Sequence, residues 1–353
     1  MRRCFSPLAA LSALAAAICF LTALPADALA PAPRPVLLGR CQRTAAKGLE
    51  GCPKNTIYVK SADELADALA GDSIVIILKS GVKYRGRFRA KRSLVIAGEL
   101  EVGAVPVLAT FACGNVESDG EDTNVLVKDV QIQNECDDNY QRSRNPPDFS
   151  YGSSPALWVA TGSSASIMDS QLYSWRSTLA VHGRANVFRS EVQGWYDWIW
   201  GTGRLFISES QIAPRGKGNI VTWDSSVSNG AVVIKSSTVG PAAEPFARKD
   251  LVAGSVYLAR PWISDTTSIW ISTKLFDIVN PALWSAQGYR GSFVDKQRGV
   301  FGSKSLNGQG YVAAKVDKKL DSSDTIDFSK YHSEEAFFDD DVDWIDGPML
   351  EWP

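Results

Sequence analysis

One carboxylate stands out because it lies inside a run of aromatic residues. Asp197 is surrounded by tryptophan and tyrosine within residues 194–201 (GWYDWIWG). Aromatic faces pack against sugar rings, and they lower the local dielectric around a carboxylate. Some of these tryptophans could simply fill a core. A carboxylate in such surroundings nevertheless needs a partner, which favours a functional role. We therefore interpret Asp197 as the candidate reactive group.

A repeat of short β segments positions this carboxylate. Four segments end in serine, any residue and an aliphatic residue; they are residues 166–172, 186–192, 206–212 and 233–239. Residues 130–132 fit the same frame two twenty-residue steps before Leu172. A βαβ unit needs about 30 residues, so the step is too short for one. The repeat favours an all-β parallel solenoid over chance alternation in a β-sandwich.

Register in such a solenoid predicts which side chains meet. Equivalent positions on successive coils lie one strand spacing apart, about 4.8 Å. Five residues past Leu172 is Ser177, and five residues past Val192 is Asp197. We therefore expect Ser177 and Asp197 to be neighbours on one face.

The residues before the repeat predict strands and one helix. Residues 55–59, 74–78 and 93–97 have the apolar character of strands. Between the first two, Ser61 is expected to cap a short helix, with Glu64 in the capping-box position.

Composition and charge restrict the partners. The chain has 353 residues, of which 45% are hydrophobic and 22% charged, and its formal net charge is -2 with a pI of about 5.8. Nucleic-acid binding needs an excess of clustered Lys and Arg, so it is not expected. An acidic polysaccharide remains compatible, since a few local cations can bind spaced carboxylates.

The N-terminus has the features of a secretion signal. A short basic region precedes an apolar run from Leu8 to Leu24, and Ala26-Asp27-Ala28 offers a cleavage site after Ala28. A membrane anchor is the alternative, but the run is short and Pro25 interrupts its flank. We expect a signal peptide over 1–28, a linker over 29–54, and a single domain over 55–353 with the C-terminal tail packed on it. The mature protein is then secreted, extracellular and not membrane-bound.

The cysteines agree with an oxidising compartment. The mature chain keeps Cys41, Cys52, Cys113 and Cys136, which allow three pairings into two disulfides. The local choice is Cys41–Cys52 with Cys113–Cys136. A zinc site is the alternative, but no C-x-x-C pair exists, and no metal or cofactor is predicted.

Several motifs together resemble those of pectin methylesterases. Residues 197–201 (DWIWG) are similar to the family's DFIFG, and residues 257–262 (YLARPW) to its YLGRPW. Residues 177–182 (STLAVH) are similar to DTLYVH, and residues 279–284 (VNPALW) to I-x-P-x-x-W. The matches follow the family's order between about residues 55 and 310. The resemblance implies a right-handed parallel β-helix, without a cofactor and expected to be a monomer.

The resemblance also implies an activity and site residues. In that family an Asp attacks the methyl ester of a galacturonate unit in pectin (homogalacturonan), releasing methanol, and a second Asp acts as acid and then as base. The matching positions here are Asp197 as nucleophile, Arg260 as the cation that keeps it charged, and Trp262 and Trp200 as substrate-binding aromatics. The second Asp corresponds to Ser177, and an oxyanion-binding Gln corresponds to Arg176. A further family Gln falls near Ser153.

Ser177 is the main departure from the family. A serine hydroxyl cannot replace a carboxylic acid, and losing a general acid–base group commonly costs about 10²–10⁴-fold in rate. Arg176 could compensate as a hydrogen-bond donor or hold a substrate carboxylate. The alternative is a degenerate homologue that binds pectin or a cell-wall partner without turnover. A polysaccharide lyase or polygalacturonase is a third reading, but the acidic clusters those enzymes use are not visible around Asp197.

Two further features have structural interpretations. His182 follows Ser177 by five residues, but a Ser-His-Asp triad lacks a G-x-S-x-G elbow, so we interpret His182 as structural. The acidic stretch 337–344 lacks the spacing of an EF-hand. We expect a solvated face beside a packed Trp344.

Overall fold

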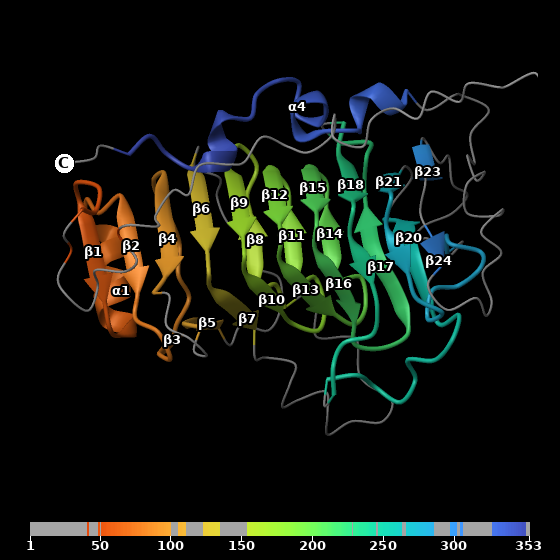
Figure 1. Ribbon diagram of the computed structural model, residues 1–353, viewed down its shortest axis with the longest axis horizontal. Helices are drawn as coiled ribbons and strands as arrows, with labels where there is room; N and C mark the ends of the chain where they lie inside the picture. The colour runs from red at the N-terminus through yellow and green to blue at the C-terminus, as the bar shows by residue number, and fades with distance from the viewer. Residues whose placement is uncertain are drawn as a thin grey trace, which may run out of the picture. The chain divides into compact units, whose positions relative to one another are not determined.

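The fold consists of coils of short parallel strands stacked along one axis (Figure 1). The computed structural model describes residues 41, 49, 51–99, 105–110, 123–134, 154–227, 229–244, 246–262, 266–285, 297–301, 304–305 and 327–350. All of them belong to the compact unit Leu37–Pro353. The expected signal peptide, most of the linker, Cys113, Cys136 and Ser153 lie outside the described residues.

The strands of the described residues form three sheets, here named A, B and C. Sheet A contains β1 (Thr56–Val59), β2 (Val75–Leu78), β4 (Leu94–Gly98), β6 (Asn124–Lys128), β9 (Ser164–Met168), β12 (Arg184–Phe188), β15 (Arg204–Ser208), β18 (Ala231–Lys235), β21 (Thr267–Ile271) and β23 (Gln297–Phe301). Sheet B contains β3 (Lys83–Arg85), β5 (Val107–Thr110), β7 (Gln131–Asn134), β10 (Gln171–Tyr173), β13 (Glu191–Gly194), β16 (Gln211–Pro214), β19 (Thr238–Val239), β22 (Lys274–Leu275) and β24 (Lys304–Ser305). Sheet C contains β8 (Leu157–Val159), β11 (Leu179–Val181), β14 (Ile199–Gly201), β17 (Gly218–Trp223) and β20 (Val256–Pro261).

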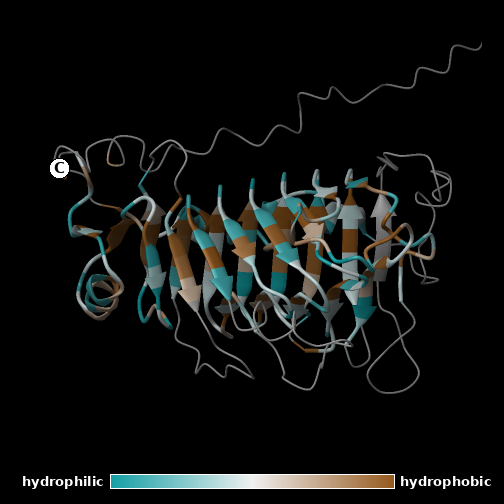
Figure 2. Ribbon diagram, turned by 90° about the horizontal axis from the view of Figure 1, so that it is seen from below, coloured by the Kyte–Doolittle hydropathy of each residue, from teal (hydrophilic) through white to brown (hydrophobic). Residues whose placement is uncertain are grey.

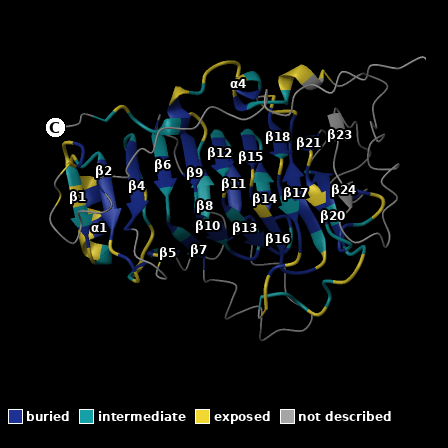
Figure 3. Ribbon diagram, viewed as in Figure 1, coloured by how far each residue is buried: buried dark blue, intermediate teal, exposed yellow. Residues whose placement is uncertain are grey.

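The predicted aliphatic stacking is confirmed inside the coils. Leu172 pairs with Val192, Val192 with Ile212, and Ile212 with Val239, all in parallel register and fully buried. Burying each such side chain stabilises the fold by about 1.5–3 kcal/mol. Figure 2 shows hydrophobic and hydrophilic residues alternating along the strands, and Figure 3 shows that most strand residues are buried. The coils therefore share one continuous core.

The serine of each repeat has a structural role at the corner between sheets A and B. The backbone N–H of Ser170 donates to Oγ of Ser190 at 3.1 Å, and that of Ser190 donates to Oγ of Ser210 at 3.1 Å. Each hydroxyl in turn donates to the carbonyl two residues earlier, as Ser190 does to Phe188 at 2.8 Å. The repeated serine thus satisfies backbone groups that the corner removes from the sheets. The β segment of each repeat is accordingly two strands joined at this corner.

The twenty-residue step is wrong for the earliest of these coils. It predicts one coil between residues 130–132 and Leu172, but Ile132 pairs directly with Leu172. A single coil of forty residues therefore connects β7 to β10. The prediction failed because a stack preserves register between neighbouring coils, whereas the chain length between them is free to vary.

The first helix has the predicted cap. Helix α1 (Ala62–Ala70) begins after Ser61, whose side chain accepts from the N–H of Glu64 at 3.2 Å. The Glu64 carboxylate reaches back to the N–H of Lys60 at 2.5 Å, one residue before the position expected for a capping box. Among the described residues, none of the helices is long and apolar enough to cross a bilayer.

The C-terminal residues 327–350 pack on the outer face of sheet A (Figure 1). They form η3 (Phe328–Lys330), α4 (Glu334–Phe337) and η4 (Asp343–Asp346). Trp344 is buried, as expected. The acidic side chains beside it are solvated, as expected: those of Asp339 and Asp341 are 78% and 64% exposed. Asp339 also pairs with Arg204 at 2.5 Å, and Asp341 pairs with Arg184.

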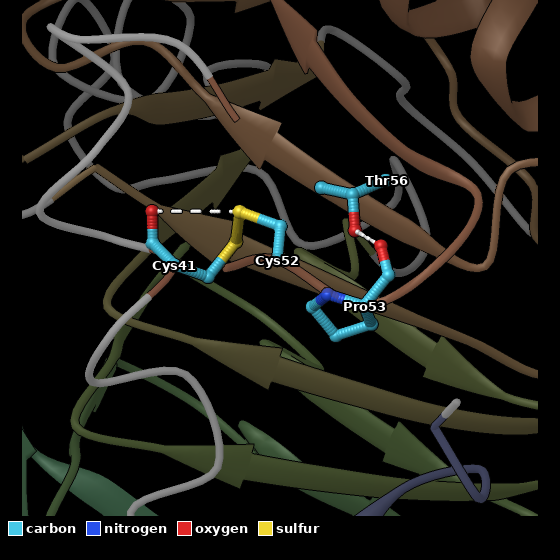
Figure 4. The surroundings of a disulfide bond; sticks show 4 residues. All are labelled: Cys41, Cys52, Pro53 and Thr56. Atoms are coloured by element: carbon cyan, nitrogen blue, oxygen red, sulfur yellow. Dashed lines mark hydrogen bonds between the residues drawn. A yellow bond between two sulfur atoms is a disulfide. The ribbon is translucent and has the colours of Figure 1, made fainter. Parts of the chain in front are cut away.

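One of the two expected disulfides falls within the described residues. Cys41 and Cys52 are bonded, and both are buried against the outer face of sheet A (Figure 4). Close by, the Thr56 hydroxyl donates to the carbonyl of Pro53 at 2.6 Å, where β1 begins.

Candidate active site

Asp197 lies at the corner between sheets B and C, in the turn from β13 to β14. Ser177 occupies the same turn one coil earlier, between β10 and β11. Both have left-handed backbone conformations, with φ of 49° for Asp197 and 55° for Ser177. The N–H of Ser177 donates to the carbonyl of Asp197 at 3.1 Å. This contact confirms the predicted neighbourhood. The same left-handed conformation recurs at the corner between sheets A and B, for example at Asp169 and Arg189, so here it is a feature of the coil corners.

The Asp197 carboxylate is buried and held by a bidentate arginine. Nε of Arg260 donates to Oδ1 at 2.8 Å, and Nη2 donates to Oδ2 at 2.5 Å. The Thr222 hydroxyl donates to Oδ1 at 2.6 Å, and only 2% of Asp197 is exposed. Burial lowers the pKa of Arg260, but the hydrogen bonds and attraction of Asp197 outweigh it and raise the pKa. Such a pair fixes the orientation of the carboxylate.

Strand register in sheet C brings the cation and the aromatic rings to the same outer face. Trp158, Ala180, Trp200, Thr222 and Arg260 follow one another at equivalent positions of β8, β11, β14, β17 and β20. The residues on either side of this column, such as Leu179 and Ile199, belong to the core. Side chains alternate between the two faces of a strand, so the column points outward.

Four half-buried rings, here called the aromatic strip, lie on this face: Trp158, His182, Trp200 and Trp262. The His182 ring centroid is 4.7 Å from that of Trp158 and 4.8 Å from that of Trp200. Trp200 is 5.9 Å from Trp262, which lies 5.6 Å from the Arg260 guanidinium. The strip therefore reaches the Asp197–Arg260 pair. Trp198, by contrast, is fully buried in the core, so part of the aromatic run is core filling.

His182 belongs to the aromatic strip and not to a triad. Its Nδ1 lies 2.9 Å from the Thr202 hydroxyl, and burial lowers its pKa. The carboxylate of Asp197 is meanwhile engaged by Arg260 and Thr222. Within the described part of the chain, the Ser177, His182 and Asp197 side chains do not form a hydrogen-bonded relay.

Arg176 lies beside Tyr196, with which its backbone forms a parallel bridge. Burial raises the pKa of Tyr196, and so does the nearby Asp197 charge, while Arg260 and Arg176 oppose the shift. The Arg176 charge therefore acts at the same corner as the carboxylate. Its hydrogen bonding to a substrate remains a prediction.

Two glycines permit the close packing of this corner. A Cβ on Gly194 would lie 2.3 Å from Cβ of Trp198. Gly201 has a φ of 157°, and a Cβ there would lie 1.8 Å from the carbonyl oxygen of Val181. Only glycine fits at these two positions without moving the backbone.

Replacing Gly201 with alanine is therefore expected to lower the free energy of unfolding by about 2–5 kcal/mol, combining backbone strain with a clash. Gly254→Ala is the matched control, because Gly254 has a φ of 72° but its Cβ would meet nothing closer than 3.8 Å. Urea unfolding should show a clearly smaller loss for the control. Equal losses would contradict the packing argument.

Sequence reasoning missed three residues of the site. Thr222 and Asn219 face the carboxylate, the latter with Nδ2 at 3.5 Å from Oδ1. Trp200 pairs with Thr222, which lies 22 residues later in the chain. A step of twenty residues from Trp200 therefore ends two residues before Thr222. Trp158 pairs with Ala180 across a similar step of 22. One signal for Trp158 was available in the sequence. Ala180 stands where the family motif has a tyrosine, and a large side chain on the neighbouring strand could fill the space that this alanine leaves.

No resident metal is indicated by the described residues. Groups of three or more His, Cys, Asp or Glu side chains suited to a metal ion are not found among them. The cation that pairs with the Asp197 carboxylate is the guanidinium of Arg260.

Comparison with known proteins identifies the family. Residues 90–296, more than half of the chain, match the sequence profile of the pectinesterase family. Pectinesterase 2 of Citrus sinensis is 23% identical over 250 residues, which cover 65% of this chain and 45% of that protein. The chain spans less than half the length of the curated relatives it matches.

Solved structures agree on the fold. A pectin methylesterase in complex with a hexasaccharide superimposes with a TM-score of 0.56 at 20% identity, covering 83% of this chain and 94% of that one. The pectin methylesterase from carrot gives 0.58 at 18% identity, with coverage of 82% and 93%. The predicted right-handed parallel β-helix is thereby confirmed. With this fold and a profile match over more than half its length, the chain belongs to the pectinesterase family.

Proposed function

We propose that this protein hydrolyses carboxyl esters of galacturonate in pectin, releasing methanol slowly from methyl-esterified homogalacturonan. The observation that carries the proposal is the bidentate Asp197–Arg260 pair next to the rings of Trp200 and Trp262. A charged carboxylate that is held in one orientation beside aromatic rings is suited to attack the ester carbonyl of a sugar bound on those rings.

The proposed steps use residues of this chain. Asp197 attacks the ester carbonyl carbon while Arg260 holds the carboxylate in position. The bond to the methoxy oxygen then breaks, which leaves an acyl-enzyme, and the departing methoxide takes a proton from water to give methanol. Trp262 and Trp200 bind sugar rings, and Arg176 provides a positive charge at the same corner. Water then hydrolyses the acyl-enzyme, which returns Asp197 and leaves a free galacturonate.

Ser177 supports a second candidate function, binding of pectin or a cell-wall partner without turnover. The Ser177 backbone N–H contacts the Asp197 carbonyl, at the position where the resemblance calls for a carboxylic acid. Protein that binds methyl-esterified homogalacturonan but releases no methanol above background would favour this second function.

Loss of the nucleophile tests the first function. Asp197→Asn is expected to abolish methanol release from methyl-esterified homogalacturonan, because an amide does not replace the carboxylate. Asp169→Asn is the matched control, since Asp169 also has a φ of 49° and pairs with Arg189 at 2.8 Å, but it lies at the corner between sheets A and B. Equal activity of wild type and Asp197→Asn would refute the proposed role of Asp197.

The setting of the protein is also proposed. Cleavage of residues 1–28 would give a secreted, extracellular protein with a single domain over 55–353, and the buried Cys41–Cys52 disulfide supports an oxidising compartment. We expect a monomer and a second disulfide, Cys113–Cys136. Mass spectrometry of the secreted protein under non-reducing conditions checks the cleavage site and the pairing.

A further inference from the structure

The position that would donate a proton to the leaving group holds a hydroxyl. Ser177 is 96% buried, and its backbone N–H is bonded to the carbonyl of Asp197, so it occupies the adjacent position one coil earlier. The side chains bonded to the Asp197 carboxylate within the described structure are Arg260, Thr222 and Asn219. None of these groups is an acid that loses a proton near neutral pH.

With no such acid among these described side chains, the leaving group decides which esters can react. A tetrahedral intermediate formed by carboxylate attack expels its weaker base, so an unprotonated leaving group must compete with Asp197. Methoxide is about as basic as hydroxide, and the pKa of its conjugate acid lies far above that of a carboxylic acid. A phenolate, with a conjugate acid of pKa about 10, leaves far more readily without protonation. Without a general acid, esters of phenols should therefore be favoured over esters of simple alcohols.

The aromatic strip offers a surface for such a leaving group. Ala180 follows Ser177 by three residues and pairs with Trp158 on one side and Trp200 on the other. The ring centroids of these two tryptophans are 5.8 Å apart. Nε1 of Trp158 and Nε2 of His182 are buried and make no hydrogen bond within the described structure. Because these nitrogens are buried, Trp158 and His182 offer ring carbons and not these nitrogens to a ligand, which suits an aryl group better than sugar hydroxyls.

We infer that this chain cleaves aryl esters of galacturonate, in which a phenolic oxygen carries the acyl group, in preference to methyl esters. The inference rests on the proposed esterase function of Asp197. In the first step a bond forms between Asp197 Oδ and the acyl carbon, the bond to the aryl oxygen breaks, and a phenolate departs. Water then adds to the mixed anhydride, giving galacturonate and the Asp197 carboxylate, and the two released protons go to the phenolate and to solvent.

A leaving-group series tests the inference. The probes are 4-nitrophenyl, phenyl and methyl esters of the same galacturonate oligomer, assayed with full-length wild type and Ser177→Asp. For each protein, kcat/KM is measured and corrected for the uncatalysed rate. The ratio of phenyl to methyl ester should be about 10²–10⁴-fold larger in wild type, because the variant restores the acid. Equal ratios in the two proteins would overturn the inference.

The possible failures are distinguishable. If wild type cleaves no ester faster than Asp197→Asn does, the proposed esterase function fails as well. If wild type cleaves methyl and phenyl esters with the same ratio as Ser177→Asp, only the aryl preference fails. Trp158→Leu adds a separate readout: KM should rise more for the phenyl ester than for the methyl ester, and an equal rise for both would remove the strip from the proposal.

Discussion

Ser177→Asp is expected to raise the turnover of methyl-esterified homogalacturonan by about 10²–10⁴-fold, the usual effect of a positioned general acid–base group. The backbone should accept the change, because Ser177 has a φ of 55°, and aspartate is among the residues most tolerant of this conformation. The negative charge of Asp197 would raise the pKa of the introduced carboxyl, which favours the protonated form that acylation requires.

The effect should depend on position and not on charge alone. Ser236→Asp is the matched control, because Ser236 is an exposed serine with a φ of 48° at the corner between sheets A and B. Methanol release should be unchanged by the control. A folded Ser177→Asp protein no faster than wild type would show that this position does not limit catalysis.

Removing either partner of the buried Asp197–Arg260 pair is expected to lower the free energy of unfolding by about 3–5 kcal/mol. Asp197 is 2% exposed and Arg260 6% exposed, so each variant leaves an uncompensated charge or donor in the interior. In a double-mutant cycle of Asp197→Asn and Arg260→Ala, the double variant should be more stable than the sum of the single losses predicts.

The exposed Asp169–Arg189 pair provides the comparison cycle. Its side chains are 24% and 55% exposed, so a coupling of about 0–1 kcal/mol is expected. Urea unfolding measures both cycles. A coupling for Asp197–Arg260 no larger than that of the exposed pair would mean that the two charges are not held together in the folded protein.

The sequence predicted those parts of the fold that repeat with a constant step. Three consecutive coils keep a twenty-residue spacing, and so the stacking of Leu172 on Val192 and of Ser177 on Asp197 followed from counting. The aliphatic residues had to face inward, because a solenoid has no other place to bury them. For these coils the spacing of the repeat and the burial of aliphatic side chains predict the same stacking.

The rest depended on insertions that change the count but not the register. Two additional residues bring Thr222 opposite Trp200, and forty residues separate the paired Ile132 and Leu172. Pairing between strands is determined by backbone hydrogen bonds and core packing, which a spacing rule cannot see. For the same reason Asn219 and Trp158 were not predicted, although Arg260 and Trp262 were identified through motif resemblance.

The most direct test of the account is to identify the residue that carries the acyl group. Protein quenched during turnover of the phenyl galacturonate ester should gain the mass of one acyl unit, located by peptide mass spectrometry on Asp197. Slow hydrolysis is expected to let this species accumulate, since Ser177 is a poor base, and Asp197→Asn should show no adduct. Product formation with an adduct on another residue, Ser177 above all, would contradict the assignment of Asp197 as the nucleophile.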